Sequence, residues 1–174
     1  MKYACYTAAV PKEQRREFNE KILYLIDAGK TEEYGVCAEL IYNAYTGEGG
    51  LHGLSRSDYA NYHEYSAAKK EVENGQVFTP PSLCRLIVEA LAPDKDAIIA
   101  DLTCGAGAFF NFLPTESNIY GCELDAKAYK VARFLYPNAN LENGDVRNYK
   151  PDIRFDYVLG NPPFNLRWDT DIWR

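Results

Sequence analysis

Apolar residues recur at helical spacing in the first part of the chain. Phe18, Ile22 and Leu25 fall on one face of a helix predicted over residues 11–28, and Gly29 is a typical stop signal. Pro11 suits the first turn, because the N–H groups of that turn have no partner within the helix. The pattern therefore predicts an amphipathic first helix.

Two more helices are predicted before residue 75. Thr31, followed by two glutamates, predicts the N-cap of a second helix. Ser57 and Asp58 predict the start of a third, which runs toward Asn74. The apolar positions of the two helices are Val36, Leu40, Ile41, Ala44, Tyr62, Tyr65 and Ala68. Together with the first helix they predict a small bundle that packs as a layer on the rest of the chain.

The pattern changes at Gln76. Thr79 is a typical N-cap, and Pro80 begins an amphipathic run that reaches Leu91. Short apolar runs then alternate with helical segments. Strands are predicted at 97–101, 119–122, 140–142 and 157–159, with one helix starting at Ala108 and another over 126–135. This alternation is typical of βαβ units and of a parallel sheet.

The predicted fold class is α/β: a Rossmann-like, doubly wound, mainly parallel sheet with an N-terminal helical layer. We expect a helical region over residues 1–74 and a core domain over residues 75–174. The chain has 174 residues, of which 47% are hydrophobic, and this length is enough to bury a core.

Composition and charge limit the class of protein and the cellular compartment that we expect. No apolar run approaches the ~20 residues of a membrane helix, and the start lacks the apolar core of a secretory signal. The five cysteines include no C-x-x-C pair and only two histidines accompany them, so we expect no metal site, no disulfide framework and a cytoplasmic protein with reduced thiols. The net charge of −6 argues against a strong nucleic-acid clamp, because phosphate contacts need clustered Lys and Arg.

Candidate binding residues follow each of the first three strands. Gly105 and Gly107 let backbone N–H groups approach a ligand closely. Glu123 ends the second strand, where a carboxylate can accept both hydroxyls of a ribose, and Asp145 follows the third, where it can accept from an adenine amino group. Because ligands of such sheets lie across the carboxyl ends of the strands, we expect these residues to meet at one edge. Either acid could instead be a helix cap.

The fourth strand is predicted to end in a rigid turn. Gly160 lets the backbone turn, whereas Pro162 and Pro163 have fixed φ angles and no N–H. The amide oxygen of Asn161, the carbonyl of Pro162 and the ring of Phe164 suit a flat base that bears an amino group. The alternative is an ordinary strand-ending turn, since Asn-Pro commonly opens a loop.

The glycine loop (residues 103–107) restricts the cofactor. It lacks the third glycine of a dinucleotide fingerprint and the Lys-Ser/Thr of a phosphate-binding loop. It also has no cation for a pyrophosphate. S-adenosylmethionine, an adenosine that carries a sulfonium amino acid, fits better.

From Gln76 to Phe164 the chain resembles the amino-group methyltransferases of nucleic acids, in particular the N6-adenine DNA methyltransferases of restriction–modification systems. The matching motifs are the leading motif at 76–80, the glycine-rich motif at 101–107, the ribose-binding motif at 121–125, the adenine-binding motif at 143–145 and the catalytic Asn-Pro-Pro-Phe at 161–164. Leu102 and Ala106 depart from the usual proline and serine of the glycine-rich motif. The serine-to-alanine difference removes one polar contact to the cofactor.

The resemblance implies a set of cofactor-binding residues. The leading motif would hold the methionine end of S-adenosylmethionine through its backbone and the Thr79 hydroxyl. The full set implied is Gln76, Val77, Phe78, Thr79, Asp101, Thr103, Gly105, Ala106, Gly107, Glu123, Asp145 and Asn161.

The resemblance also implies methyl transfer to the exocyclic N6 amine of adenine in DNA, with Asn161, Pro162, Pro163 and Phe164 as catalytic residues. Asn161 and the Pro162 carbonyl would accept the two hydrogens of the amine and stabilise the charge that develops on it. Phe164 would stack on the flipped base. No metal is required.

Several alternatives remain open at this stage. The chain ends ten residues after Phe164, where the family's sheet would continue, so we expect a part of a larger methyltransferase, a truncated copy, or a piece completed by another chain. The partners expected are DNA, further domains, and a specificity or restriction subunit. Alternative targets are RNA adenine, cytosine N4 and a protein glutamine. An alternative of another class is a non-catalytic regulatory domain that binds the cofactor or nucleic acid.

Overall fold

The fold is centred on a four-stranded parallel sheet. A computed structural model describes residues 1–6, 11–46, 56, 59–73 and 78–162. The strands are β1 (Ile99–Asp101), β2 (Ile119–Glu123), β3 (Asn140–Asn143) and β4 (Tyr157–Val158), in the order β3-β2-β1-β4. This order confirms the predicted Rossmann-like arrangement. The chain moves outward from β1 to β3 and then returns to the other side of β1, which places the switch point between β1 and β4.

The strand register brings the carboxyl ends of the strands together. Asp101, the last residue of β1, pairs with Gly121, and Glu123, the last residue of β2, pairs with Asn143. Strand β2 therefore extends two residues beyond β1. Its final carboxylate reaches the level of the loop that follows β1.

Two α-helices flank the sheet. Helix α5 (Ala126–Leu135) joins β2 to β3 and has the predicted bounds, with the Asp125 side chain accepting hydrogen bonds at its N-terminus. Helix α4 (Pro81–Leu91) precedes β1 and buries Cys84 and Val88. Its N-cap is Pro80, so the predicted cap at Thr79 is wrong by one residue; Pro81 takes the first helical position, where its missing N–H costs nothing.

The helix predicted to start at Ala108 is not formed. Between β1 and β2 the chain makes only the 3-10 turns η4 (Phe110–Phe112) and η5 (Glu116–Asn118). Six residues separate Gly107 from Pro114, and a proline cannot continue a helix because it lacks the N–H and clashes with the preceding turn. The turn η4 buries Phe110 and Asn111.

The N-terminal helices confirm one prediction and correct another. Helix α1 (Lys12–Ala28) ends at Gly29, whose φ of 65° is the left-handed conformation of a C-cap glycine. Helix α2 (Ala38–Tyr45) begins after Cys37, not at Thr31. Residues 31–35 form turns instead, because Gly35 has a φ of 67°, which a continuous helix does not allow.

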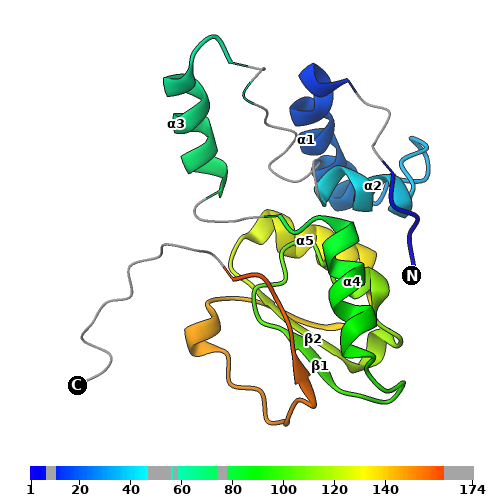
Figure 1. Cartoon of the computed structure of the whole chain (residues 1–174). Helices are drawn as coiled ribbons and strands as arrows, with labels where there is room; N and C mark the ends of the chain where they lie inside the picture. The colour runs from blue at the N-terminus through cyan, green and yellow to red at the C-terminus, as the bar shows by residue number, and fades with distance from the viewer. Residues whose placement is uncertain (7–10, 47–55, 57–58, 74–77, 163–174) are drawn as a thin grey trace.

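The third helix stands apart from the other two. Helix α3 (Tyr62–Glu73) starts after Asn61, whose side chain accepts from the Glu64 N–H at 3.0 Å and donates to the Glu64 carboxylate at 2.7 Å. Ser57 and Asp58 lie outside the described residues. In Figure 1, α1 and α2 pack together above α5, whereas α3 lies away from them, so the predicted three-helix bundle is reduced to two helices. The division at residue 74 stays a prediction.

The buried side chains of α1, α2, α4, α5 and the sheet form one hydrophobic core. Its members include Ile22 and Leu25 of α1, Ile41 of α2, and Val131 and Leu135 of α5. All five cysteines are described and each is a free thiol. No helix in the described part of the chain is long and apolar enough to span a bilayer.

Candidate cofactor and amine site

The candidate site residues gather at one edge of the sheet. All four strands are parallel, so the glycine loop after β1, Glu123 at the end of β2, Asp145 after β3 and Asn161 after β4 share the same edge. In Figure 1, β1 and β2 lie below α5, with α4 beside them. This placement agrees with the sequence-based expectation, and the roles of the residues stay predictions.

Glu123 is held by two backbone N–H groups. The Gly105 N–H donates to Oε2 at 2.7 Å and the Asp125 N–H donates to Oε1 at 2.8 Å. Burial raises the pKa of Glu123, and these two hydrogen bonds oppose that rise. The side chain is only 7% exposed. Each carboxylate oxygen can accept a second hydrogen bond, so two hydroxyl donors can be accommodated.

The two glycines of the glycine loop have different surroundings. Gly105 has a φ of 56°, and a Cβ built there would meet no atom within 4 Å. Gly107 has a φ of 83°, and a Cβ there would lie 2.6 Å from the Tyr136 ring and 2.7 Å from the Phe110 ring. Gly105 therefore leaves its backbone open to a ligand, while Gly107 is packed against the core. An open backbone beside a fixed carboxylate fits a nucleoside cofactor.

Asp101 lies beneath the loop and is 2% exposed. Its Oδ1 accepts from the Thr103 N–H at 3.1 Å. Burial raises the pKa of Asp101 to about 7, and the nearby Glu123 carboxylate adds to the rise. A Cβ on Gly160 would lie 2.7 Å from the same oxygen, so the turn after β4 rests directly against the end of β1.

Asp145 has a partner that sequence reasoning missed. It caps the 3-10 turn η6 (Val146–Asn148), accepting from the Arg147 N–H at 2.9 Å, and it pairs with the Arg147 guanidinium, whose Nε lies 2.9 Å from Oδ2. These hydrogen bonds lower the pKa of Asp145 to about 2. Asp145 therefore caps this turn, and its role toward the adenine of a cofactor stays a prediction. An Asp-x-Arg spacing is the sequence signal that would have revealed the pair.

The remaining predicted residues are partly described. Asn161 and Pro162 directly follow β4, while Gln76, Val77, Pro163 and Phe164 lie outside the described residues. Phe78 and Thr79 precede α4, and the Thr79 carbonyl accepts from the Cys84 thiol at 3.9 Å. Burial, followed by the Asp101 carboxylate, raises the pKa of Cys84 to about 12, which indicates that the start of α4 lies close to the end of β1.

Comparison with known proteins shows similarity to DNA methylases. Residues 59–174 match the family model described as N-6 DNA methylase. The type I restriction enzyme MjaIX methylase subunit of Methanocaldococcus jannaschii is 35% identical, with 65% of this chain and 24% of that protein covered. The type II methyltransferase M.CvrRI of Paramecium bursaria Chlorella virus XZ-6E is 28% identical, with 61% and 28% covered.

A solved structure is also similar. The type I restriction-modification system methyltransferase subunit from Streptococcus thermophilus is 19% identical in sequence and superposes with a TM-score of 0.42. The match covers 97% of this chain and 47% of the chain of that subunit. The chain spans about a quarter of the length of the two curated relatives described above, which are covered to 24% and 28%.

Proposed function

The chain belongs to the N-6 DNA methylase family, and we propose that it binds S-adenosylmethionine at the carboxyl edge of its sheet and takes part in methyl transfer to the N6 amine of adenine in DNA. The observation that carries the proposal is the hydrogen bond from Gly105 to Glu123, which joins the ends of β1 and β2 at 2.7 Å. It fixes a carboxylate beside an open backbone turn, as a nucleoside site requires.

The charge of this edge supports a cationic cofactor. Asp101 and Glu123 are buried carboxyls within one small region, and the charge of Asp145 is compensated by Arg147. Among the residues that the structure describes, no ion pair involves Asp101 or Glu123, and this favours a ligand that carries positive charge. S-adenosylmethionine has a sulfonium and an ammonium group, whereas a dinucleotide would bring phosphates. Bound there, S-adenosylmethionine would supply an electrophilic methyl group.

The residues of this chain have separate tasks in the proposal. Glu123 accepts the ribose hydroxyls with the oxygen positions that Gly105 and Asp125 leave available. Asp145 accepts from the adenine amino group of the cofactor while it remains paired with Arg147. The backbone of Gly105 lines the cofactor on its open side.

The turn after β4 would hold the target amine. The Asn161 side chain and the Pro162 carbonyl accept the two amine hydrogens and stabilise the positive charge that grows on nitrogen during transfer. The close contact of Gly160 with Asp101 supports this arrangement, because it keeps the turn at a fixed distance from the glycine loop. Phe164 stacks on the target base in this scheme.

The partners follow from the chain's share of its relatives. Because it spans about a quarter of the length of the two curated relatives described above, we propose that it works with further protein domains, or with the specificity and restriction subunits that accompany such methylases. Its free thiols are consistent with the cytoplasm as its location.

Tritiated methyl transfer to matched DNA, RNA and protein substrates tests the proposed function. We expect transfer to adenine in DNA. In Asn161→Ala we expect transfer to fall about 10²–10³-fold, since one contact made in the transition state is lost. Binding of S-adenosylmethionine, measured by calorimetry, should stay within about twofold, because the cofactor's ribose contacts are unchanged.

Three outcomes would contradict parts of the proposal. Equal loss of binding and transfer in Asn161→Ala would remove Asn161 from the amine site. Cofactor binding with no transfer to any substrate would favour a non-catalytic regulatory domain. Transfer to RNA, cytosine or protein glutamine in place of DNA adenine would correct the substrate.

A further inference from the structure

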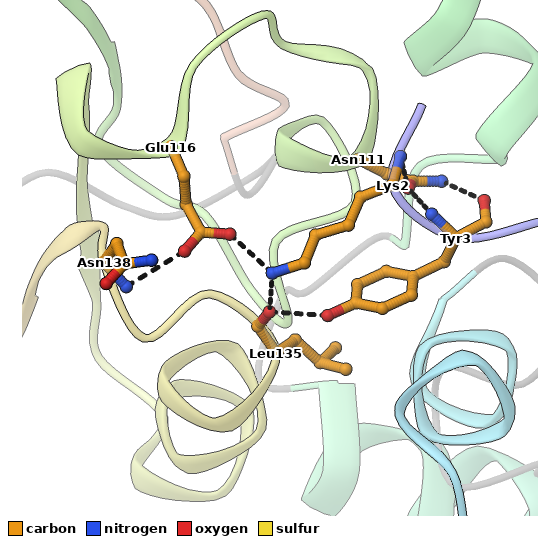
Figure 2. Close-up of polar contacts among 6 residues, drawn as sticks. All are labelled: Lys2, Tyr3, Asn111, Glu116, Leu135 and Asn138. Carbon is orange, nitrogen blue, oxygen red and sulfur yellow. Dashed lines mark hydrogen bonds and ion pairs between the residues drawn. The ribbon is translucent and has the colours of Figure 1, made fainter.

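The N-terminal segment (residues 1–6) is bound to the core at sites far along the chain. Figure 2 shows the Lys2 ammonium between two acceptors: the Leu135 carbonyl at 2.7 Å and the Glu116 carboxylate at 2.5 Å. The second oxygen of Glu116 accepts from the Asn138 N–H at 3.0 Å. Lys2 thus links η5 to the C-terminal end of α5.

Tyr3 is fixed at both its backbone and its side chain (Figure 2). Its N–H donates to Asn111 Oδ1 at 2.5 Å, and the Asn111 amide donates back to the Tyr3 carbonyl at 2.9 Å. The Tyr3 hydroxyl donates to the Leu135 carbonyl at 2.6 Å. A residue bonded at both ends has one orientation, so the position of its ring is defined.

The Tyr3 ring lies against two other tyrosines. It stacks on Tyr42 of α2, with ring centroids 5.6 Å apart, and it meets Tyr136 edge-on at 5.9 Å. Both partners are buried, at 0% and 1% exposure. We call Tyr3, Tyr42 and Tyr136 the tyrosine cluster.

The tyrosine cluster contacts the glycine loop on its core-facing side, at Gly107. The Tyr136 ring lies where a Cβ on Gly107 would be 2.6 Å away, and the Tyr42 hydroxyl donates to the Ala108 carbonyl at 3.3 Å. The Tyr136 hydroxyl is buried and has no hydrogen-bond partner among the described residues. Its ring packs against Gly107, Phe110 and Tyr3, and the Lys2 ammonium lies 5.2 Å from the ring centroid.

We propose that Tyr3 is a positioning residue for the glycine loop, acting through Tyr42 and Tyr136. This inference rests on the proposed function, in which the loop lines the cofactor. The Gly107 N–H donates to the Cys104 carbonyl at 2.8 Å, and the Gly105 N–H joins the loop to Glu123 at 2.7 Å. The tyrosine cluster packs on the other side of the loop, at Gly107, and supports it in the position where that second bond can form. Removing the Tyr3 ring would open space behind Tyr136, and the loop could then move away from the carboxylate.

The test compares Tyr3→Ala with Leu25→Ala. Leu25 is 1% exposed and lies on α1, which carries no residue of the tyrosine cluster, so its loss destabilises the same core while all three tyrosines stay in place. Two quantities are measured on the full chain: amide hydrogen exchange over residues 105–108 without ligand, and S-adenosylmethionine affinity by calorimetry. In Tyr3→Ala we expect faster exchange in the loop and affinity lower by about threefold to thirtyfold, the range typical of residues that act through others.

For Leu25→Ala we expect general destabilisation with loop exchange and affinity close to those of the parent. Equal changes in the two variants, or no change in Tyr3→Ala, would overturn the proposal. If Tyr3→Ala does not fold, Tyr42→Phe takes its place, because it removes only the hydroxyl that contacts Ala108. Faster loop exchange is expected there as well, and unchanged exchange would overturn the proposal.

The exchange measurement separates this inference from the proposed function. If the parent chain does not bind S-adenosylmethionine, the proposed function fails, while the exchange comparison still decides whether Tyr3 holds the loop. If the parent binds and the two variants behave alike, the positioning role fails and the proposed function stands.

Discussion

Single side chains at the sheet edge owe their chemistry to burial and to backbone donors. Glu123 is a carboxylate whose two oxygens are each fixed by an N–H, and Asp101 is a carboxyl whose charged form is disfavoured by its surroundings. Sequence could place Glu123, because the residue that ends a parallel strand has a defined position. It could not place Tyr3, because contacts between residues more than a hundred positions apart leave no local pattern.

Asp101 predicts how stability depends on pH. Its pKa is about 7 in the folded protein, against about 3.9 in an unfolded chain, so the folded state binds the proton more tightly. This contribution to stability is fully present below about pH 4 and is lost as the pH rises through about 7. The pKa of Glu123 is raised as well and acts in the same direction.

We therefore expect the melting temperature of the parent to rise as the pH is lowered from 8 to 6. In Asp101→Asn, which cannot take up the proton, the rise should be smaller. Thermal melts at closely spaced pH values measure the difference. The pKa of Asp145 is lowered to about 2, so its contribution to stability is constant between pH 6 and pH 8 and is lost only in much more acidic solution. Identical profiles for parent and variant would show that Asp101 does not titrate in this range.

Elements with a strong local pattern were predicted well. The bounds of α5 and the end of β2 at Glu123 match the prediction, because an apolar helical face and a β-prone run each have a clear period. The start of α2 and the missing helix after Gly107 were not foreseen. In both places a glycine in the left-handed region or a proline overrides the apolar spacing.

In the glycine loop, a side chain added at Gly105 should cost less stability than one added at Gly107. Gly105→Ala should cost about 1–2 kcal/mol of unfolding free energy, the cost of a left-handed φ, because its Cβ meets no atom. Gly107→Ala should cost about 1–3 kcal/mol more, since its Cβ also overlaps the Tyr136 and Phe110 rings. Denaturant unfolding of the two variants measures both costs. Equal destabilisation would mean that the core does not press on Gly107.

At the scale of the whole molecule, β4 forms an edge of the described sheet. Among the described strands it pairs with β1 alone, and its Val158 side chain is 63% exposed. An exposed apolar edge strand is a template for pairing with another chain.

We expect the chain to self-associate as its concentration rises, and Val158→Lys to reduce that association, because a charge on an edge strand opposes pairing. Leu124→Lys is the matched control, since Leu124 is 67% exposed but lies beyond the end of β2. Sedimentation velocity across a concentration series gives the average mass. Equal effects of the two substitutions would show that general surface charge, and not the edge of β4, controls association.

We propose that Glu123 and the glycine loop bind S-adenosylmethionine. Calorimetric titration of the cofactor into the parent, Glu123→Gln and Glu89→Gln tests it most directly, because both substitutions remove one negative charge and Glu89 lies on the exposed side of α4. Loss of hydrogen bonds to a charged group costs about 1.5–3 kcal/mol, so affinity should fall about tenfold to hundredfold in Glu123→Gln and stay unchanged in Glu89→Gln. Unchanged affinity in Glu123→Gln, or an equal loss in both variants, would show that Glu123 does not bind the cofactor.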